Sequence, residues 1–417
     1  MLACGAGPWH HPSFAATSAT MPDTDTAAAR PPAPRIHGLD TLRAAAVTLV
    51  VLHHYTLFVS GAPTFGWVGT IGWAGVDVFF ALSGYLIGNQ LFAPLASGGG
   101  LALGPFYARR LLRTLPNFWV VLALYVLWPA WRGAAPMLPL WRYLTCTLNL
   151  DLPPGTAFSH AWSLCIEEQF YLLLPAAALL GAALGRRGGR PEWAWWALLL
   201  AVAAGMATRA ALWHEGQQAA NTLRHYYQFI YYASWCRCDE LLAGVALALL
   251  KNGRPDLWRR ILAHGNLLLA AGTAVVAGTF AWFLRDRYGL APTVVGHPLL
   301  GAGCALLILA ALAPGSVLHR LRVPGAAHLA LWSYAIYLTH RSVSALVAAR
   351  MAAAGFGPGE TITIGACMLA SLLGGWLLYR LVETPFMRLR ERWLPGRPRV
   401  PGGDERAALS APGPAPR

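Results

Sequence analysis

Long apolar stretches follow one another along most of the chain, separated by short polar joins. Each stretch is near the ~20 residues that an α-helix needs to cross the hydrocarbon core of a bilayer. Because lipid satisfies no backbone polar groups, such stretches form helices or a closed barrel, and their length and continuity exclude the barrel. The pattern predicts an all-α, polytopic integral membrane protein with about ten transmembrane helices. The spans are expected near residues 39–59, 70–92, 112–131, 161–184, 193–213, 229–250, 261–284, 297–314, 329–349 and 361–382.

The composition agrees with this class of protein. Hydrophobic residues make up 56% of the chain and charged residues only 12%, whereas about 25% of the residues of a soluble protein are charged. The net charge of +14 comes almost entirely from arginine, since Lys251 is the only lysine. The arginines cluster in alternate joins, which is typical of the positive-inside rule and does not indicate nucleic-acid binding. Together with an even number of spans, this predicts that both termini face the cytoplasm.

The two ends of the chain lack apolar periodicity. Residues 1–36 are rich in Ala, Pro, Thr and Ser, without the basic and apolar regions of a signal peptide. They are expected to be a disordered cytoplasmic segment, followed by a ten-helix domain over 37–392 and a disordered basic tail over 393–417. The seven cysteines are scattered, and Cys236-x-Cys238 lacks the second pair of a zinc site. No disulfide framework and no metal site are predicted.

An arginine and two histidines lie inside the first predicted span. His54 follows Arg43 by eleven residues, which at ~100° per residue puts both side chains on one helix face, ~16 Å apart along the axis. His53 is rotated by ~100° and is expected to face a neighbouring helix. A histidine bonding across helices is the structural alternative for His54. The arginine in phase with it, and other polar residues at similar depth, favour a functional role.

Other ionisable residues also fall inside predicted spans, where lipid makes them costly unless they are paired or wet. Arg237 and Glu240 are one helical turn apart and are expected to pair. Glu167 and Glu168 are expected about two turns below the outer surface. An inert ion-pair network that holds the bundle together is the structural alternative for the whole set. The remaining members are Asp77, Tyr85 and His340, the last again near mid-depth.

Arginines also precede the third span. Arg109 and Arg113 are four residues apart on one helix face, a spacing that suits a clamp for a phosphate-bearing ligand. For Arg110, beside them, ordinary topogenic charge is a sufficient explanation. Glu383 ends the last predicted span, where its charge opposes the helix dipole, so it is expected to need a cation such as Arg380 or one of the Arg109–Arg113 group.

In their order and spacing these stretches make the chain similar to the membrane acyltransferase-3 family, which contains bacterial O-antigen and exopolysaccharide O-acetylases. The resemblance covers about residues 36–392. The matching stretches are "GLDTLRAAAVTLVVLHH", "GVDVFFALSGYLIG", "RRLLRTLP", "HAWSLCIEEQFYLLLP", "RCDELLAG", "SYAIYLTH" and "LVETP".

The resemblance implies transfer of an acyl group, usually acetyl from acetyl-CoA, to a hydroxyl of a carbohydrate or glycolipid at the bacterial inner membrane. It makes His54 the essential histidine, Arg43 its paired arginine, and Arg109 and Arg113 the motif associated with the acyl donor. Many relatives carry a C-terminal periplasmic esterase-like domain, which is not seen in this sequence. Transfer is therefore expected to be completed in the membrane domain or by a separate periplasmic partner.

These parts permit a mechanism in which His54 takes the proton from the acceptor hydroxyl, since histidine titrates near neutral pH. Arg43 would hold or polarise the donor, and the Arg109–Arg113 group would bind the phosphates of CoA. Either Glu168 or Glu167 would orient the histidine or hold Arg237. Asp77, Tyr85, Arg237, His340 and Glu383 are expected to support the site rather than react. No metal is required.

Other classes of protein fit the same features less completely. A transporter or flippase for a glycan or glycolipid also buries charges around a central cavity. A glycosyltransferase acting on lipid-linked sugars usually has Asp-rich metal sites or large outer loops, which this sequence does not show. An acyltransferase with a succinyl or longer donor, or with a non-glycan acceptor, is the nearest alternative.

Overall fold

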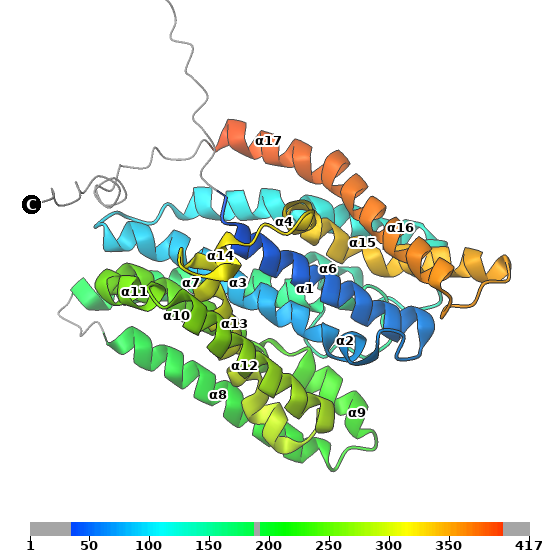
Figure 1. The fold of residues 1–417 in the computed structure, drawn as a ribbon, viewed down its shortest axis with the longest axis horizontal. Helices are drawn as coiled ribbons and strands as arrows, with labels where there is room; N and C mark the ends of the chain where they lie inside the picture. The colour runs from blue at the N-terminus through cyan, green and yellow to red at the C-terminus, as the bar shows by residue number, and fades with distance from the viewer. Residues whose placement is uncertain (1–34, 187–191, 395–417) are drawn as a thin grey trace, which may run out of the picture. The chain divides into compact units, whose positions relative to one another are not determined.

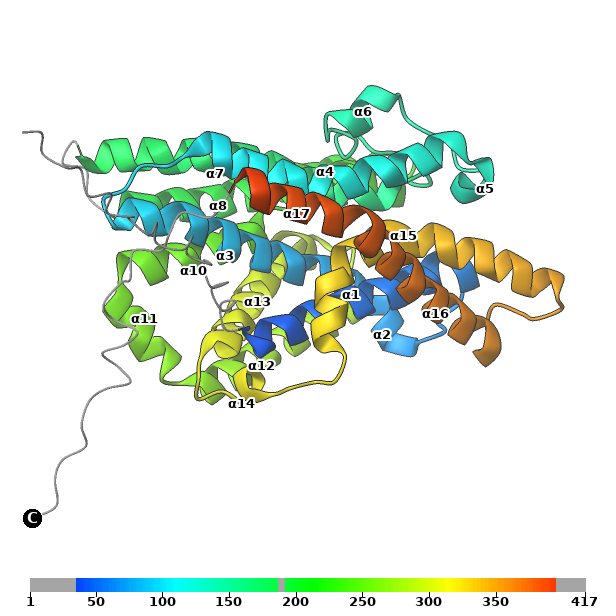
Figure 2. The ribbon, with the colours of Figure 1, turned by 90° about the horizontal axis from the view of Figure 1, so that it is seen from above.

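The computed structural model describes residues 35–186 and 192–394, and those from Ile36 onward belong to one compact unit. The described part is helical and contains no β-strand, as predicted (Figures 1 and 2). The predicted disordered segments, 1–36 and 393–417, lie almost entirely outside the described residues. The inner end of the unit is defined as the end at which the first helix begins.

Eleven helices carry the architecture of the described part: α1 (His37–Tyr55), α3 (Gly75–Ala96), α4 (Leu103–Leu127), α7 (Trp162–Arg186), α8 (Trp193–Gly216), α10 (Asp239–Gly253), α12 (Gly265–Arg285), α13 (His297–Leu312), α15 (Ala326–Ala353), α16 (Thr361–Leu378) and α17 (Thr384–Trp393). Short helices join them: α2 (Gly66–Ile71), α5 (Pro129–Arg132), α6 (Leu140–Leu144), α9 (Thr222–His225), α11 (Pro255–Leu262) and α14 (Val317–Arg320). Four π-helical turns extend or precede long helices: Thr56–Ser60, Tyr226–Tyr231, Pro292–Gly296 and Tyr379–Glu383.

Eight helical segments of the described residues are long and apolar enough to cross a membrane. They match eight of the ten predicted spans, and the unmatched two lie near 229–250 and 329–349. Helix α10 has only 15 residues, and α15, with 28 residues, interrupts its apolar positions with His328, His340 and Arg341. The chain is therefore a multi-pass membrane protein, while the count of ten spans and the orientation of the termini stay predictions.

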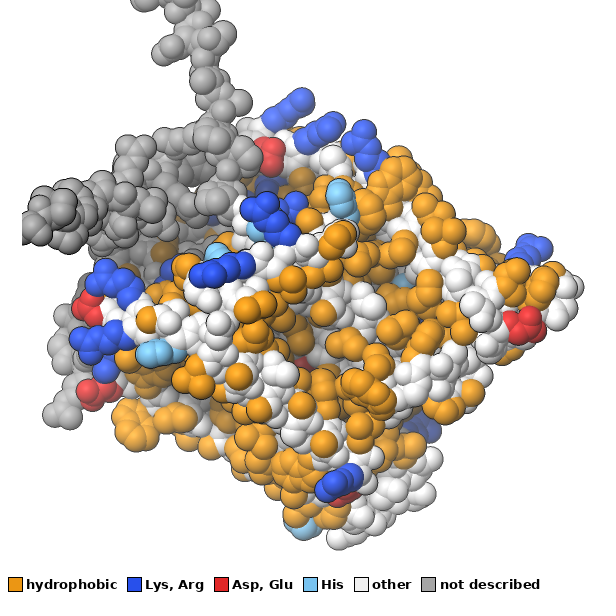
Figure 3. Space-filling view, viewed as in Figure 1, with side chains coloured by type: hydrophobic (Ala, Val, Ile, Leu, Met, Phe, Trp, Pro, Cys, Tyr) orange, Lys and Arg blue, Asp and Glu red, His pale blue; other side chains and the backbone are white. Residues whose placement is uncertain are grey.

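The surface has the character expected in contact with lipid. Figure 3 shows broad hydrophobic areas over the middle of one face, with most Lys and Arg side chains toward its margins. Large apolar side chains on α7 and α8 are well exposed, such as Leu172 at 63%, Trp196 at 69% and Leu200 at 71%. Exposure of this extent is costly in water and favourable in hydrocarbon.

The sixth predicted span is not one continuous helix. The π-helical turn Tyr226–Tyr231 ends, a short 3₁₀ turn covers Ser234–Cys236, and α10 starts only at Asp239. The break lets the Cys236 carbonyl oxygen accept a hydrogen bond from Arg209 Nη1 at 2.7 Å, which a continuous helix would use internally. It also puts two acidic residues in the first turn of α10, where the helix dipole favours negative charge. Apolar periodicity does not reveal such a break.

Helices α3 and α10 pack closely side by side (Figure 1). A Cβ atom on Gly84 would lie 2.0 Å from the Leu241 carbonyl oxygen, and one on Gly244 would lie 2.1 Å from that of Ala81. No side chain larger than a hydrogen atom fits at either position, so the two glycines set the distance between the helices. This contact fixes the position of the buried charges that both helices carry.

Candidate active site

The inner half of the unit contains a cavity of about 290 Å³ between α1, α3, α4, α7 and α15. Its walls combine apolar side chains with a concentration of charge, three arginines and two carboxylates. The polar side chains in its lining include Arg43, Arg110, Arg113, Glu167, Glu168 and Tyr337. A cavity of this kind, apolar with a few converging charges, is typical of a binding site for a small molecule or cofactor.

The arginine pair on α4 differs from the predicted one. Arg110 and Arg113, three residues apart, line the cavity, whereas Arg109 does not. The Arg110 guanidinium lies 5.3 Å from the ring centre of Tyr171, and Arg109 acts electrostatically on Arg390 of α17 instead. The predicted arginine group thus reaches the cavity through Arg110 and Arg113, and the roles of Arg109, Arg110 and Arg113 in binding the donor stay predictions. Both i+3 and i+4 neighbours share a helix face, and packing decides which of them turns toward a cavity.

The two glutamates lie in this cavity and not beside the histidine or Arg237. Glu167 accepts hydrogen bonds from the Tyr171 hydroxyl at 2.6 Å and from Ser83 Oγ at 3.3 Å. Glu168 interacts with Thr114 and Arg110. Both predicted contacts were therefore wrong, because residues 156–163 are buried and α7 begins inside the protein rather than at its surface.

A cluster of three histidines lies farther along α1, beyond the cavity. His54 Nδ1 and His340 Nε2 are 2.7 Å apart, and the two rings stack with their centres 4.9 Å apart. The His160 ring centre is 6.0 Å from that of His54 and 5.7 Å from that of His340. His54 is partly exposed, while His160 and His340 are buried. His53 donates from Nδ1 to the Gly69 carbonyl oxygen at 2.7 Å, so it faces a neighbouring helix as predicted.

Hydrogen bonding around His340 fixes the direction of the pair. His340 Nδ1 lies 2.9 Å from the Ile336 carbonyl oxygen, and a carbonyl only accepts, so this nitrogen carries a hydrogen. In neutral His340 the other nitrogen, Nε2, is then an acceptor, and His54 Nδ1 donates to it. Within the described part of the chain no group is hydrogen-bonded to the remaining nitrogen of His54, Nε2, so its lone pair is free. A free lone pair on a fixed imidazole is what a general base requires.

The cavity and the histidines meet at Tyr337 of α15. Its side chain lines the cavity, and its ring centre is 5.8 Å from that of His160 and 6.0 Å from that of His340. The hydroxyl donates to the His160 carbonyl oxygen at 2.5 Å and lies 2.7 Å from Ser163 Oγ. His54 itself is not among the residues that line the cavity. Tyr337 therefore separates the arginine-rich cavity from the histidine cluster.

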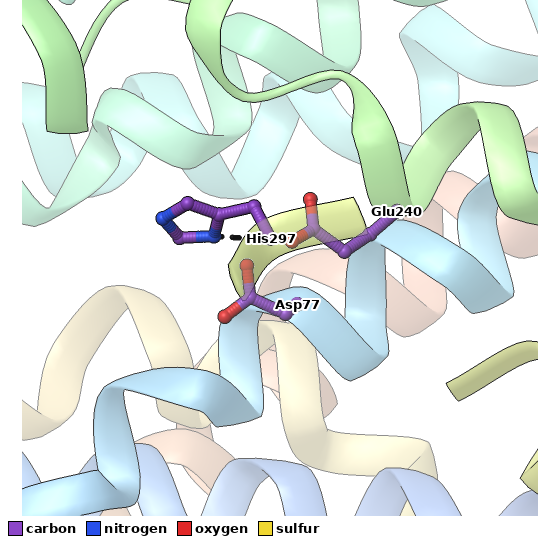
Figure 4. Close-up of side chains that lie close together, drawn as sticks. All are labelled: Asp77, Glu240 and His297. Carbon is purple, nitrogen blue, oxygen red and sulfur yellow. Dashed lines mark hydrogen bonds and ion pairs between the residues drawn. The ribbon is translucent and has the colours of Figure 1, made fainter. Parts of the chain in front are cut away.

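A second charged cluster connects α3, α10 and α13 (Figure 4). Arg237 is hydrogen-bonded to Asp77, both side chains being fully buried. The predicted partner Glu240 interacts with Arg237 electrostatically, but the direct partner of the guanidinium is Asp77. Glu240 instead lies 3.3 Å from His297, measured from Oε1 to Nδ1. Next to it, Arg209 and Asp239 form an ion pair at 2.5 Å. This part of the site is the buried ion-pair network that the sequence left open as an alternative.

The same cluster has the donor atoms that a metal ion would need. One oxygen each of Asp77 and Glu240 and one nitrogen of His297 lie within 4.8 Å of one another. Asp77 Oδ2 and Glu240 Oε2 are buried without a hydrogen-bond partner among the described residues. A cation placed there would have to share Asp77 with the Arg237 guanidinium, which already neutralises it. The prediction of a site without metal stays a prediction.

Two further predicted residues take positions outside the cavity. The Tyr85 hydroxyl accepts from Lys251 Nζ at 3.5 Å, and its ring stacks on Trp258. Glu383 does not end a helix, because the π-helical turn continues into α17. Its Oε2 accepts from Asn117 Nδ2 at 2.9 Å, and Arg113 acts on it electrostatically, as expected for one of the α4 arginines.

Three residues of the site were not proposed from the sequence: His160, His297 and Tyr337. His160 could have been proposed from the sequence, because it is the first residue of the stretch "HAWSLCIEEQFYLLLP", which carries both glutamates. The residues around it are as apolar as those around His54. Tyr337 and His297 have no comparable signal, because an aromatic or a histidine in an apolar span is more often an ordinary core residue.

Fold and site together define a helical membrane protein with an arginine-lined cavity on one side of a histidine cluster. The model of one protein family, described as an acyltransferase domain, matches residues 36–380. The chain belongs to this acyltransferase-3 family, and the predicted resemblance is confirmed.

Two curated proteins illustrate the relationship. The chain is 29% identical over 334 residues, 75% of its own length, to a Bacillus subtilis protein named "Putative peptidoglycan O-acetyltransferase YrhL", of which it covers 49%. It is 30% identical over 232 residues, 52% of its length, to the peptidoglycan O-acetyltransferase OatA of Listeria monocytogenes, of which it covers 34%. The chain thus spans about half or less of these relatives. No solved structure matches it significantly.

Proposed function

We propose that this protein transfers an acetyl group from acetyl-CoA to a hydroxyl of a cell-wall or cell-surface carbohydrate. The observation that carries the proposal is His54, whose free Nε2 is set by the His340 hydrogen bond, on the same helix as the cavity residue Arg43. Family membership and the names of the relatives support acyl transfer to such an acceptor. The donor and the location in the bacterial inner membrane are what the resemblance to the family implies.

The donor would enter the cavity from the inner end. Arg110 and Arg113 suit the phosphates of CoA, since guanidinium groups bind phosphate with charge-assisted, often paired hydrogen bonds. Helix α1 is unbroken from Arg43 to His54, so the two residues are ~16 Å apart along its axis. An extended pantetheine arm is comparable in length. The arm is therefore long enough for the thioester to reach the histidine cluster, provided that the side chain of Tyr337, which separates the two, turns aside.

The chemical step needs one base. His54 Nε2 takes the proton of the acceptor hydroxyl while its oxygen attacks the thioester carbonyl. When the tetrahedral intermediate collapses, the carbon–sulfur bond breaks and the imidazolium returns the proton to the CoA thiolate. The products are an acetyl ester and free CoA, and no metal takes part. Arg43, at the cavity wall, is available to hold the donor during this step.

A second form of the proposal uses a partner. Because the relatives are longer than this chain, the acetyl group can be passed to a further domain or a separate protein at the outer surface. The test is purified protein in nanodiscs with labelled acetyl-CoA and short cell-wall oligosaccharides. Acetylated oligosaccharide, detected as a gain of about 42 Da, the formula mass that an acetyl group adds, supports direct transfer. Release of CoA without acetylated sugar supports the partner form.

The transporter alternative predicts a different result. Labelled oligosaccharide would then accumulate in proteoliposomes that contain this protein and no acetyl-CoA. Transport of this kind, together with no consumption of acetyl-CoA, would contradict the proposed function.

The arginines of α4 should determine the affinity for the donor. We expect Arg110→Gln or Arg113→Gln to raise the KM for acetyl-CoA by about 10- to 100-fold, the loss of one charge-assisted hydrogen bond of ~1.5–3 kcal/mol. Arg109→Gln is the matched control, because Arg109 carries the same charge on the same helix without lining the cavity. An equal rise in KM for Arg109→Gln would show that only the general positive charge matters.

His340 should act through His54. In His340→Ala the Nδ1 hydrogen of His54 loses its acceptor, so the proton is no longer directed to that nitrogen. We expect kcat to fall by about 100-fold, the lower part of the range for general base catalysis, with the KM for acetyl-CoA unchanged. Thermal unfolding of the variant in detergent separates this from misfolding. A variant with normal kcat would contradict the positioning role of His340.

A further inference from the structure

Two arginines lie on the side of His54 that faces away from the cavity. Arg341 follows His340 in α15, and its guanidinium lies 3.9 Å from the ring centre of Phe58, one turn beyond His54 on the same chain segment. Arg287 lies in the join between α12 and the Pro292–Gly296 turn. It acts electrostatically on His53, as Arg341 does on His54. The two guanidinium groups therefore lie near His53 and His54, at the end of α1 opposite to Arg43.

Arg287 is surrounded by aromatic faces. Its guanidinium carbon lies 4.5 Å from the Trp73 ring centre, 5.6 Å from that of Tyr231 and 5.6 Å from that of Tyr288. Among the residues that the structure describes, it has no carboxylate partner and no hydrogen bond. The side chain is partly exposed. A guanidinium held only by ring faces keeps all five of its N–H donors free.

The positive charge of Arg341 is likewise not balanced by a carboxylate of the described residues. Its Nη1 donates to Ser159 Oγ at 2.9 Å, and the described part of the chain gives it no acidic partner. It is also partly exposed. Tyr232, itself half-buried, lies within electrostatic reach of both Arg341 and Arg287, so the two guanidinium groups belong to one region. We name this region the arginine–aromatic cluster, formed by Phe58, Trp73, Tyr231, Tyr232, Arg287 and Arg341.

In the cavity, by contrast, the charge of an arginine is balanced by carboxylates. There, Arg110 lies within electrostatic reach of both Glu167 and Glu168. Two partly buried cations without such a partner, Arg341 near the candidate base and Arg287 near its neighbour His53, remain costly until an anion joins them. A guanidinium binds carboxylate or phosphate, and aromatic rings beside it offer flat faces for a sugar ring. The cluster thus has the chemistry of an acceptor site.

We propose that the arginine–aromatic cluster binds the acceptor and selects an acidic carbohydrate, one whose carboxylate lies a short distance from the hydroxyl that is acetylated. This inference rests on the proposed function, and it names the substrate class of the same site. Arg287 and Arg341 hold the carboxylate, and the half-buried ring of Tyr232 borders the sugar. With the anion fixed on one side, the hydroxyl is presented to His54 Nε2, opposite the side from which the donor arrives.

The experiment measures binding of the acceptor alone, without acetyl-CoA. The probes are a tetrasaccharide of alternating N-acetylglucosamine and N-acetylmuramic acid and its methyl ester, which differs only in charge. Wild-type protein in nanodiscs of zwitterionic lipid should bind the free acid at least about tenfold more tightly than the ester, the effect of one hydrogen bond to a charged group. Arg287→Gln and Arg341→Gln should each remove this preference and leave the affinity for the ester unchanged.

Arg285→Gln is the matched control, since Arg285 is exposed at the end of α12, two residues before Arg287. It should keep the preference of the wild type. Equal binding of acid and ester by the wild type, or binding of neither, overturns the proposal even if acetyl-CoA is still consumed. Loss of the preference when anionic lipid replaces zwitterionic lipid would assign the cluster to lipid headgroups and overturns it as well. Failure to consume acetyl-CoA, with the preference intact, would count against the proposed function alone.

Discussion

Replacing His54 by alanine is expected to lower the rate of acetyl transfer by about 10³-fold, within the 10²- to 10⁴-fold range of a positioned general base. The loss should appear in kcat, because His54 does not line the cavity that would hold CoA, and the KM for acetyl-CoA should stay close to that of the wild type. The measurement is steady-state transfer of labelled acetyl to oligosaccharide by the purified protein in nanodiscs. Added imidazole should restore part of the rate, since it supplies the missing base at the vacated position.

His53→Asn is the control for this experiment. His53 is the neighbouring residue and equally a histidine in α1, but its ring is used to donate to the Gly69 carbonyl oxygen. An amide at this position can still donate, so its kcat should stay within a few-fold of the wild type. If His54→Ala transfers acetyl at the wild-type rate, or if both variants lose activity to the same extent without rescue by imidazole, His54 is not the base.

The sequence predicts the relation between Arg43, His53 and His54 because they share one uninterrupted helix. Within such a helix, 100° and 1.5 Å per residue fix both the direction and the spacing of side chains. In the structure Arg43 accordingly lines the cavity, His53 contacts α2 and His54 contacts α15. The geometry of a single helix does not determine which neighbouring helix each side chain contacts. The hydrogen bond from His54 to His340, 286 residues away in the chain, depends on tertiary packing alone.

The predicted contacts of Glu167 and Glu168 failed for a related reason. Counting turns from a loop assumes that the helix begins at the membrane surface, but residues 156–163 enter the protein before α7 starts. Arg109 lies outside the cavity lining because of its rotation about the helix axis, since neighbouring arginines on one helix are packed against different elements. Hydropathy along the chain reports neither effect. Both appear only when the helices are placed against one another.

The charged residues of the inner bundle thus separate into two groups with different expected behaviour. Arg43, Arg110, Glu167 and Glu168 surround a cavity, where water or a ligand can reach them. Asp77 and Arg237 have side chains that are fully buried and bonded to each other. Changes in the first group should alter binding with little effect on folding. Changes in the second group should act first on stability.

Asp77→Asn is expected to destabilise the protein by about 3–5 kcal/mol, the usual effect of removing one member of a buried ion pair. Arg237 would keep its charge in a fully buried position, with no carboxylate bonded to it, between the rings of Trp162 and Tyr231. Arg237→Met should have a similar effect, because it leaves Asp77 charged. The free energy of unfolding is measured by titrating mixed detergent micelles with a denaturing detergent.

The double variant Asp77→Leu/Arg237→Met decides whether the charges themselves are needed. Since it removes both members and keeps most of their volume, it should recover much of the stability lost by either single change. Asp256→Asn is the control, because its ion pair with Arg259 is exposed and should contribute nothing measurable. If the double variant is as unstable as the single ones, the position requires charge for a reason other than mutual neutralisation. The free oxygens of Asp77 and Glu240, together with His297, would then become the first place to look for a bound cation.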